Sequence, residues 1–406
     1  MAAGHQRHGP VFRMEIDGAD TVLVGTWAGL GELFAAERGR LDVLNTPLVH
    51  DLFGQALFNL TGVAHTEARR RLRPPLSSRA LAGYVMPLLE VAAPTAAQWA
   101  IDPGEDLYAA AREVTLAMSA RILLGIRPGE ADAQIFADAF DGFVTATTAP
   151  SGRRRYMAGR YWSGLIARRR LHALFTRRAV EAGRDRSGAA LGGLAAGFEG
   201  APDELGPLAD HLLTLLIAAR ETTASLITWC LVELARHPEH AALSAVEARS
   251  AVAEPELLVQ REALPIMHSV LAETQRLHSP NLLSVRRAVC PLELGGYQVP
   301  AGFRVAYSLS TGHFDPSRYP QPLAFRPGRF VSRQASSSGL WAFGGGAHAC
   351  LGRPLAELMA LTVLVTVLNQ GLPRLPTGPP VRVRYRPAKV PSDPVPFAIE
   401  ALEPAL

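Results

Sequence analysis

A glycine-rich segment that brings one cysteine to the start of an apolar helix constrains this chain more than any other feature. It runs from Trp341 to Pro354 and is followed by an apolar run from Leu355 to Leu368. Three consecutive glycines, 344–346, allow backbone conformations closed to other residues and a close approach to a bulky group. Pro354 suits the first turn of a helix. A sulfur just before a helix N-terminus meets unpaired N–H donors and the positive end of the helix dipole, which favours the thiolate. Cys350 is therefore predicted to be a metal ligand or a nucleophile.

Cysteine usage argues against a disulfide framework, because the three cysteines Cys230, Cys290 and Cys350 are scattered and odd in number. No CxxC pair occurs. His237 and His240 are separated by Pro238, which breaks the helix that a paired metal site would need. A structural zinc site is not expected.

The sequence favours a soluble, cytoplasmic protein. No apolar run approaches the roughly 18 residues that span a bilayer, and the longest clear one is Leu212 to Ala219. Residues 1–10 are polar and lack the apolar segment of a signal peptide. No linker or charge block divides the chain, so residues 1–406 are expected to form a single domain.

Net charge is +4, and arginines cluster at 69–73, 153–155 and 168–170. Such clusters are compatible with nucleic acid or an anionic membrane surface. Few aromatic residues interleave with them and no nucleic-acid-binding motif occurs. We therefore interpret the clusters at 153–155 and 168–170 as solvated helix faces and expect no nucleic-acid partner.

Residue periodicity predicts a mainly helical chain with a small β region. Strands are expected within 11–25 and at 292–294, 297–300 and 303–309, with two short strands in 381–399. Helices are expected at 27–38, 80–100, 107–124, 131–146, 160–182, 208–236 and 264–277, and around 65–73. The stretches 41–62 and 371–380 are predicted to be irregular, and 183–206 is predicted to be a surface connection with a weak helix at most.

The helix from Leu208 to Arg236 is the second organising feature. It is apolar nearly all round, as expected of a helix buried through a large core, and would be about 44 Å long. Two charges and two hydroxyls, residues 220–223, interrupt it. Polar groups inside a core are costly unless paired or used, so this cluster is hard to explain as a structural feature alone.

The pattern Phe343, Gly346, Cys350 and Gly352 resembles the haem-binding loop of the cytochrome P450 family. The resemblance implies haem b as cofactor and Cys350 as the axial ligand of its iron. Phe343 and Gly346 would then be cofactor-binding residues. His348 stands where the family usually has Arg or His, and is expected to bind a haem propionate.

Four further motifs in the family's order and spacing extend the resemblance over essentially the whole chain. His65 and Arg69 resemble its HxxxR helix and are expected to bind a propionate. Arg286 matches the second propionate-binding arginine, with Arg287 as its rival. Glu273 and Arg276 resemble the ExxR pair, which Arg329 completes as a structural triad.

The polar interruption of the long helix resembles the oxygen-activation motif of the family. Thr222 and Glu221 are expected to be catalytic, supplying protons on the distal side of the haem. Ala219 departs from the pattern, because glycine is usual there, and its methyl narrows the groove beside the iron. Substrate contacts are expected from one face of this helix and from a segment near Arg286; they are Leu215, Ala218, Ala219, Leu282 and Leu283.

The implied fold is the mainly α P450 fold, with the long central helix above the haem. The implied reaction is insertion of one oxygen atom from O2 into a lipophilic terpenoid, steroid or polyketide-like molecule, in secondary metabolism. The fold uses all 406 residues, so electrons are expected from a separate ferredoxin or flavodoxin and its NAD(P)H-dependent reductase. Arg70, Arg71, Arg73 and Arg353 are expected to form the basic docking patch for that partner.

Three alternatives stay open at this point. A family member can use peroxide or catalyse a non-oxygenating rearrangement, although such members often lack the threonine or the acid. A haem sensor or binding protein without turnover is a second. The third takes glycines 344–346 as a phosphate-binding loop, but no Gly-Lys-Ser/Thr follows them.

Overall fold

The structure, a computed structural model, describes residues 4, 7–150, 152–185, 190–196, 198, 205–281, 283–331, 340–385 and 388–401. The chain divides into two compact units, and each is described by itself. The first unit comprises residues 1–42, 92–112 and 221–406, and the second comprises 43–91 and 113–220. The helices α5, α6 and α10 contribute residues to both units.

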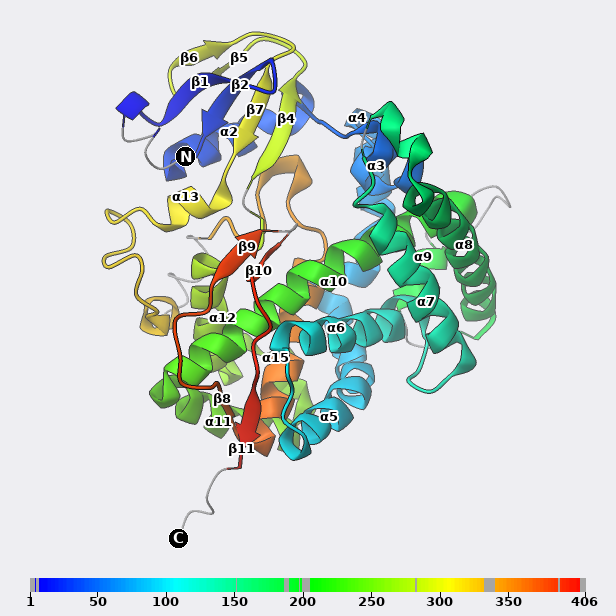
Figure 1. The fold of residues 1–406 in the computed structure, drawn as a ribbon, viewed down its shortest axis with the longest axis vertical. Helices are drawn as coiled ribbons and strands as arrows, with labels where there is room; N and C mark the ends of the chain where they lie inside the picture. The colour runs from blue at the N-terminus through cyan, green and yellow to red at the C-terminus, as the bar shows by residue number, and fades with distance from the viewer. Residues whose placement is uncertain are drawn as a thin grey trace. The chain divides into compact units, whose positions relative to one another are not determined.

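A five-stranded sheet with the order β1-β2-β7-β4-β3 forms one part of the first unit (Figure 1). Its strands are β1 (Val11–Ile16), β2 (Ala19–Val24), β3 (Leu41–Val43), β4 (Ser284–Ala288) and β7 (Arg304–Tyr307). β1 and β2 form an antiparallel hairpin, β2 runs parallel to β7, and β4 is antiparallel to β7. The helix α2 (Trp27–Arg40) follows this hairpin, and its buried residues join the apolar cluster of the sheet.

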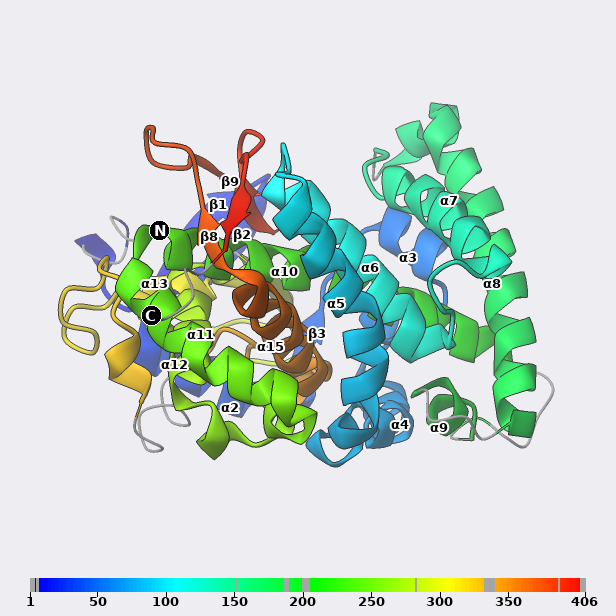
Figure 2. The same ribbon diagram turned by 90° about the horizontal axis from the view of Figure 1, so that it is seen from below.

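Three helices pack together elsewhere in the first unit, namely α11 (Pro238–Ala253), α12 (Pro265–Leu277) and α15 (Arg353–Gln370) (Figure 2). α15 is buried almost throughout, as its apolar sequence requires. The other elements of this unit are α13 (Leu309–His313), η6 (Pro255–Val259), η7 (Arg261–Ala263), η8 (Pro327–Phe330) and η9 (Gly346–His348). Three antiparallel strand pairs complete it; they are β5 (Leu292–Leu294) with β6 (Tyr297–Val299), β9 (Val383–Tyr385) with β10 (Lys389–Pro391), and β8 (Leu372–Arg374) with β11 (Ala398–Glu400).

The second unit is helical. Its elements are α3 (Pro47–Phe53), η1 (Leu57–Asn59), α4 (Gly62–Leu72), η2 (Pro74–Leu76), η3 (Ser78–Tyr84), α7 (Ala131–Ala146), η4 (Arg153–Met157), α8 (Gly159–Asp185) and α9 (Ala190–Ala196). The helices shared with the first unit are α5 (Val85–Ile101), α6 (Leu107–Leu124) and α10 (Leu205–Arg236). α7 and α8 make the most extensive pairing, with Phe136, Phe140 and Phe175 buried.

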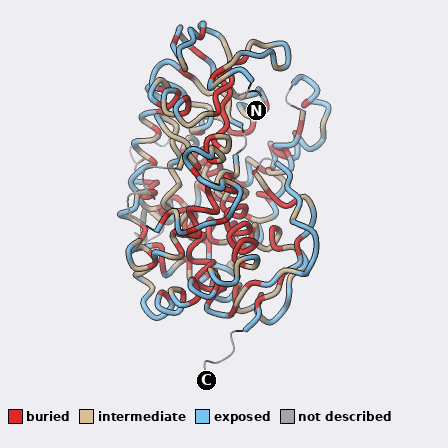
Figure 3. The backbone as a smooth tube through the Cα atoms, turned by 90° about the vertical axis from the view of Figure 1, so that its left-hand side faces the viewer, coloured by how far each residue is buried: buried red, intermediate tan, exposed pale blue. Residues whose placement is uncertain are grey.

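Buried and exposed residues alternate along most helices, as amphipathic helices require (Figure 3). α12 differs, because every residue from Ser269 to Leu277 is buried, including Glu273 and Arg276. α10 contains buried residues on all sides over 223–234. The mainly helical fold with a small β region is confirmed.

Several predicted elements have the expected bounds. α6 spans Leu107–Leu124, α7 spans Ala131–Ala146 and β5 spans Leu292–Leu294, as predicted. The prediction that 41–62 is irregular is wrong in its middle, where Thr46 caps α3 by accepting the N–H of Val49. The stretch 183–206 contains the short helix α9, which agrees with the prediction of a weak helix at most. α11 was not predicted at all.

Two of the arginines interpreted as solvated are not. Arg155 is buried and its Nε lies 2.6 Å from an Asp51 carboxylate oxygen. Arg168 pairs with the buried Asp210 at 2.5 Å. Both arginines compensate carboxylates of the second unit, whereas Arg153, Arg154, Arg169 and Arg170 are exposed as predicted.

Within the described residues, two helical stretches are long and apolar enough to cross a membrane by length and composition, 78–101 and 205–236. The sequence prediction that nothing approaches this length counted uninterrupted apolar runs and missed windows that tolerate a charge. A buried core helix meets the same criteria, and 67% of the apolar window in 205–236 is buried. Meeting these criteria of length and composition is therefore weak evidence that either helix crosses a membrane.

Candidate haem-thiolate site

The cysteine loop closes on itself and rests on α2. The Cys350 N–H donates to the Phe343 carbonyl at 2.9 Å, and the Gly344 N–H donates to the Trp341 carbonyl at 2.8 Å. The ring centroid of Trp341 lies 5.2 Å from that of Trp27 and 5.0 Å from that of Phe34. Gly344 and Gly346 have φ of 71° and 65°, values that favour glycine. These contacts hold the loop in one shape immediately before α15.

Cys350 is exposed, and Gly352, the N-cap residue of α15, offers no side chain to the first N–H groups of the helix. The sulfur therefore lies in the kind of environment that stabilises a thiolate. Cys230 is the contrast, because complete burial raises the pKa of its thiol to about 12. Cys230 is therefore a small apolar residue of the core.

Glu37, which the sequence analysis did not single out, joins the loop to β4. One carboxylate oxygen accepts the Arg286 Nε–H at 2.9 Å, and the other accepts the backbone N–H of His348 at 3.1 Å. The signal was present, because Glu37 follows Leu30, Leu33 and Phe34 at helical spacing on the apolar face of α2. An acid at such a position needs a partner.

The neighbours Arg286 and Arg287 differ in burial, because successive side chains of a strand point to opposite faces. Arg286 lies on the side of Glu37 with 12% of its side chain exposed, and its guanidinium lies 5.4 Å from the Tyr307 ring centroid. Arg287 is exposed. Of the two, Arg286 is the one whose position is tied to the cysteine loop.

His65 and Arg69 lie one turn apart on α4 of the second unit. His65 is buried and Arg69 is half-buried. Their neighbours Arg70 and Arg71 both pair with Glu67, at 2.7 and 3.0 Å. These two arginines lower the pKa of Glu67 to about 2. Two charges of the expected docking patch are thus partly neutralised within their own helix.

The polar cluster of α10 has structural partners. The Glu221 carboxylate accepts the Arg112 Nε–H at 3.0 Å and also the hydroxyl of Tyr108, both from α6. Arg220 pairs with Asp141 at 2.7 Å. The sequence argument that this cluster lacks a structural explanation is therefore wrong for its two charges, Arg220 and Glu221, whereas the buried Thr223 hydroxyl has no hydrogen-bond partner among the described residues. The proton-supplying roles of Glu221 and Thr222 stay predictions.

The predicted structural triad is brought together. Arg276 donates through Nε and Nη2 to the Glu273 carboxylate, at 2.8 Å each, and both side chains are completely buried. Arg329 Nε lies 3.3 Å from the same carboxylate. Arg276 also donates to the carbonyls of His313 and Pro322. The pair thus anchors the chain segments that precede the cysteine loop.

The predicted substrate residues of α10 share a less buried stripe. Leu215, Ala218, Ala219 and Thr222 are all half-buried, whereas Leu216 and Thr223 beside them are buried. Spacings of three, one and three residues place them on one helical face. Leu283 is 44% exposed. Leu282 lies outside the described residues.

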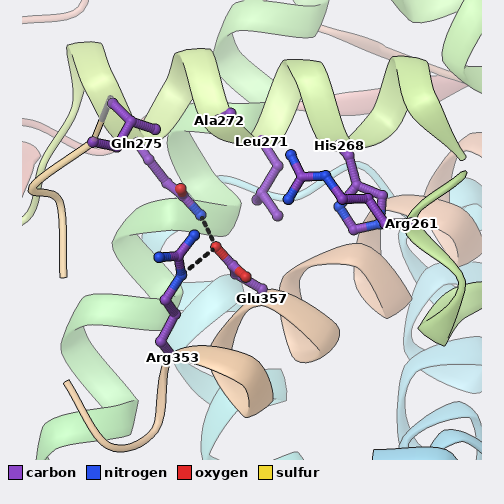
Figure 4. A pocket seen from close by; sticks show the side chains of 8 residues that line it. Arg261, His268, Leu271, Ala272, Gln275, Arg353 and Glu357 are labelled. Carbon is purple, nitrogen blue, oxygen red and sulfur yellow. Dashed lines mark hydrogen bonds and ion pairs between the residues drawn. The ribbon is translucent and has the colours of Figure 1, made fainter. Parts of the chain in front are cut away.

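A small space lies between α12 and the first turns of α15, which begins at Arg353 (Figure 4). Glu357 accepts hydrogen bonds from Gln275 at 3.2 Å and from Arg353 at 3.1 Å there. The space has a volume of about 10 Å³, which suits a single water at most, so the space cannot hold an organic substrate.

A protein-family model described as cytochrome P450 matches residues 205–371, which include α10, the Glu273–Arg276 pair and the cysteine loop. Abscisic acid 8'-hydroxylase 3 from Oryza sativa is 28% identical over 96% of this chain and 79% of its own length. Putative cytochrome P450 137 from Mycobacterium tuberculosis is 28% identical over 95% of this chain and 84% of its own. The chain is similar to the cytochrome P450 family, through the family model over residues 205–371 and through these relatives over nearly its whole length.

Solved structures agree on the P450 fold. Retinoic acid-bound cyanobacterial CYP120A1 superposes with a TM-score of 0.85 at 22% identity, covering 98% of this chain and 93% of that one. The haem domain of cytochrome P450DA superposes with a TM-score of 0.83 at 22% identity, covering 99% and 92%. The predictions of a P450 fold, a P450 monooxygenase and haem b as cofactor are confirmed.

The residues of this chain fit haem chemically. Haem iron takes a thiolate as one of its protein ligands, and Cys350 presents its sulfur from a rigid loop at a helix N-terminus. The propionates of haem need cationic donors. Arg286 is tied through Glu37 to that same loop, so a thiol and a guanidinium are held by one scaffold.

Proposed function

We propose that this protein inserts one oxygen atom of O2 into a lipophilic small molecule, with Cys350 as the axial ligand of its haem. The observation that supports this proposal most directly is the exposed Cys350 just before α15, where its backbone N–H donates a hydrogen bond to the Phe343 carbonyl. Haem, when bound through a thiolate, supplies reductive activation of dioxygen, because the thiolate favours O–O cleavage.

The residues of the chain contribute binding and proton handling. Arg286, His348, His65 and Arg69 are proposed to bind the propionates. The Thr222 hydroxyl and the Glu221 carboxylate are proposed to hold and pass protons on the substrate side. The burial of this helix face supports the role, because Ala218, Ala219 and Thr222 are half-buried whereas the neighbouring Leu216 and Thr223 are buried.

The names of the relatives support a terpenoid substrate. Abscisic acid, in the name of the rice hydroxylase, and retinoic acid, bound to the cyanobacterial protein, are both isoprenoid carboxylic acids. We propose a lipophilic terpenoid as the first class to test, with steroids and polyketides next. A role in secondary metabolism and a cytoplasmic location are proposed on the sequence alone.

The ligand is tested by spectroscopy. Reduced protein under carbon monoxide should show the red-shifted Soret band of thiolate ligation, and Cys350→Ser should lose it. Cys290→Ser is the matched control, because Cys290 is a half-buried cysteine outside the loop. Retention of the band in Cys350→Ser would refute the assignment.

The reaction class is tested by turnover. A screen of terpenoids for displacement of iron-bound water, read as a Soret shift, selects substrates for assays with ferredoxin, reductase and NADPH. One labelled oxygen atom from ¹⁸O2 should enter the product. Turnover only with peroxide would favour a peroxide-using enzyme, and binding without NADPH consumption would favour a sensor.

A separate electron donor is proposed to dock through basic residues. Arg73 is the sharpest test, because it is exposed and has no ion pair within the described part of the chain, whereas Arg70 and Arg71 share Glu67. Arg73→Glu should slow reduction by ferredoxin at low salt, where exposed charges are least screened. The exposed Arg249 of α11 gives the control, Arg249→Glu. Equal reduction rates in both variants would exclude Arg73 from docking.

A further inference from the structure

Glu37 is a fully buried carboxylate outside the family motifs. Its side chain is 0% exposed at the last regular turn of α2, just before the backbone leaves helical geometry at Arg38 and Gly39. Removing a carboxylate from water is costly unless it is paired and hydrogen-bonded. The hydrogen-bond partners of Glu37 therefore indicate its structural role.

Its two oxygens serve two segments far apart in the sequence. Oε1 accepts from Arg286 of β4 at 2.9 Å, and Oε2 accepts from the His348 backbone in the cysteine loop at 3.1 Å. Breaking such a buried pair is expensive, whereas keeping both bonds fixes both segments relative to α2. One carboxylate thus sets the distance between the loop and an arginine.

The loop approaches Glu37 so closely that Gly346 has no room for a side chain. A Cβ at Gly346 would lie 2.6 Å from Glu37 Oε2 and 2.6 Å from the Phe34 carbonyl oxygen. A Cβ at Gly345 would lie 2.6 Å from the Phe34 ring. The seat of the cysteine loop is therefore the end of α2, with Glu37 as its polar contact.

The pairing with Glu37 uses only part of the hydrogen-bonding capacity of the Arg286 guanidinium. The Nε of Arg286 is bound by Glu37 and its Nη1 donates to the Val285 carbonyl at 3.2 Å. Its Nη2 makes no hydrogen bond to any residue that the structure describes. The guanidinium is thus oriented by the carboxylate and neutralises it, while one nitrogen stays available to an anion.

We propose that Glu37 is a positioning residue of the haem site, which holds the Cys350 loop and Arg286 in the arrangement that binds the thiolate-ligated iron and a propionate together. This inference rests on the roles proposed for Cys350 and Arg286. Removing Glu37 leaves Arg286, which has 12% of its side chain exposed, without its carboxylate and the loop without its polar anchor, so both contacts to haem weaken at once.

Haem retention tests the proposal without measuring activity. In holo-protein, haem loss to excess apomyoglobin should be about 10- to 100-fold faster in Glu37→Leu, the usual range for residues that orient a metal ligand. The thiolate fraction of the reduced carbon monoxide complex should fall with it. Glu37→Gln, which keeps one acceptor, should be intermediate. Glu32→Gln is the matched control, since Glu32 is an exposed acid of the same helix.

A second comparison separates positioning from general damage. The quantity to compare is the fold increase in haem-loss rate over the wild type in Glu37→Leu, in Arg286→Leu and in the double variant Glu37→Leu/Arg286→Leu. The increase in the double variant should be smaller than the product of the two single increases, because the two residues act through one pair. An increase in the double variant equal to that product would overturn the proposal, as would a haem-loss rate in Glu37→Leu equal to that of the wild type. If Glu37→Leu does not fold by far-ultraviolet circular dichroism, wild-type haem loss in Glu37→Gln overturns it.

The outcomes also separate this inference from the proposed function. A thiolate band that survives Cys350→Ser refutes the proposed ligand and the inference with it. A wild-type band that Cys350→Ser removes, together with unchanged haem loss in the Glu37 variants, refutes only the positioning role.

Discussion

At the scale of single residues, the charged groups of α10 show how a motif can carry structural and chemical demands at once. Glu221 is 15% exposed and is bound by Arg112, which is 31% exposed, and by the hydroxyl of Tyr108. A hydrogen bond to a charged group contributes about 1.5–3 kcal/mol, and a neutral one about 1 kcal/mol. The residue proposed to handle protons is therefore also part of the packing between α6 and α10.

This double demand predicts a measurable coupling. Arg112→Leu and Tyr108→Phe should each lower the free energy of unfolding by about 1.5–3 kcal/mol, because both side chains donate to the same carboxylate. Both losses should shrink to a few tenths of a kcal/mol in a Glu221→Leu background, because the shared acceptor is gone. Urea unfolding of the haem-loaded variants measures this, and equal losses in both backgrounds would contradict the pairing.

At the scale of elements, the contact between the cysteine loop and α2 predicts a contrast between two glycines. Gly344 and Gly346 both have positive φ, so alanine at either costs about 1 kcal/mol in backbone conformation. Only at Gly346 does the new Cβ meet atoms, the Glu37 carboxylate and the Phe34 backbone, whereas nothing lies within 4 Å at Gly344. Gly346→Ala should therefore lose most of its thiolate-type haem, measured under carbon monoxide, and Gly344→Ala should keep it.

Strand β10 is joined to α10 through one carbonyl. Both Ser225 Oγ and Trp229 Nε1 donate to the Lys389 carbonyl oxygen, at 2.6 and 2.8 Å. Ser225→Ala and Trp229→Phe each leave that oxygen one partner and should cost about 1 kcal/mol. Together they remove both of these donors, which should add about 1–3 kcal/mol beyond the sum. A double-mutant cycle in urea tests this, and strict additivity would show that the carbonyl finds another donor.

Helices and strands with a strong local periodicity of apolar residues could be predicted from the sequence. Hydrogen-bonded pairs of residues far apart in the sequence could not. α6 and α7 have their expected ends because apolar spacing and a closing Gly125 mark them. α11 was missed because His237 and Pro238 suggested a break, whereas Pro238 begins a helix. The Cys350 loop was recognisable as a motif. Its anchor Glu37, 311 residues from His348, and the partners of Glu221, 109 and 113 residues away, are set by the fold alone.

At the scale of the whole molecule, burial of neutral histidines predicts acid sensitivity. Burial lowers the pKa of His211, His268 and His278 to about 4 and that of His313 to about 3. Each unfolded imidazole binds a proton below about 6.5, while the folded one stays neutral down to its lowered pKa. The unfolded chain then holds more protons, so stability is complete above pH 6.5 and falls as the pH drops toward 4.

His268 allows this prediction to be tested at one site. Its Nε2 has no hydrogen-bond partner among the described residues, so His268→Leu strands no other group. The slope of unfolding free energy against pH between about 4.5 and 6 should flatten by up to about 1.4 kcal/mol per pH unit, the linkage of one proton. His50→Leu is the control, since His50 is exposed at the end of α3. Urea unfolding across this range compares both with the wild type. A slope in His268→Leu as steep as that of His50→Leu would mean that the half-buried His268 imidazole is already protonated in the folded chain.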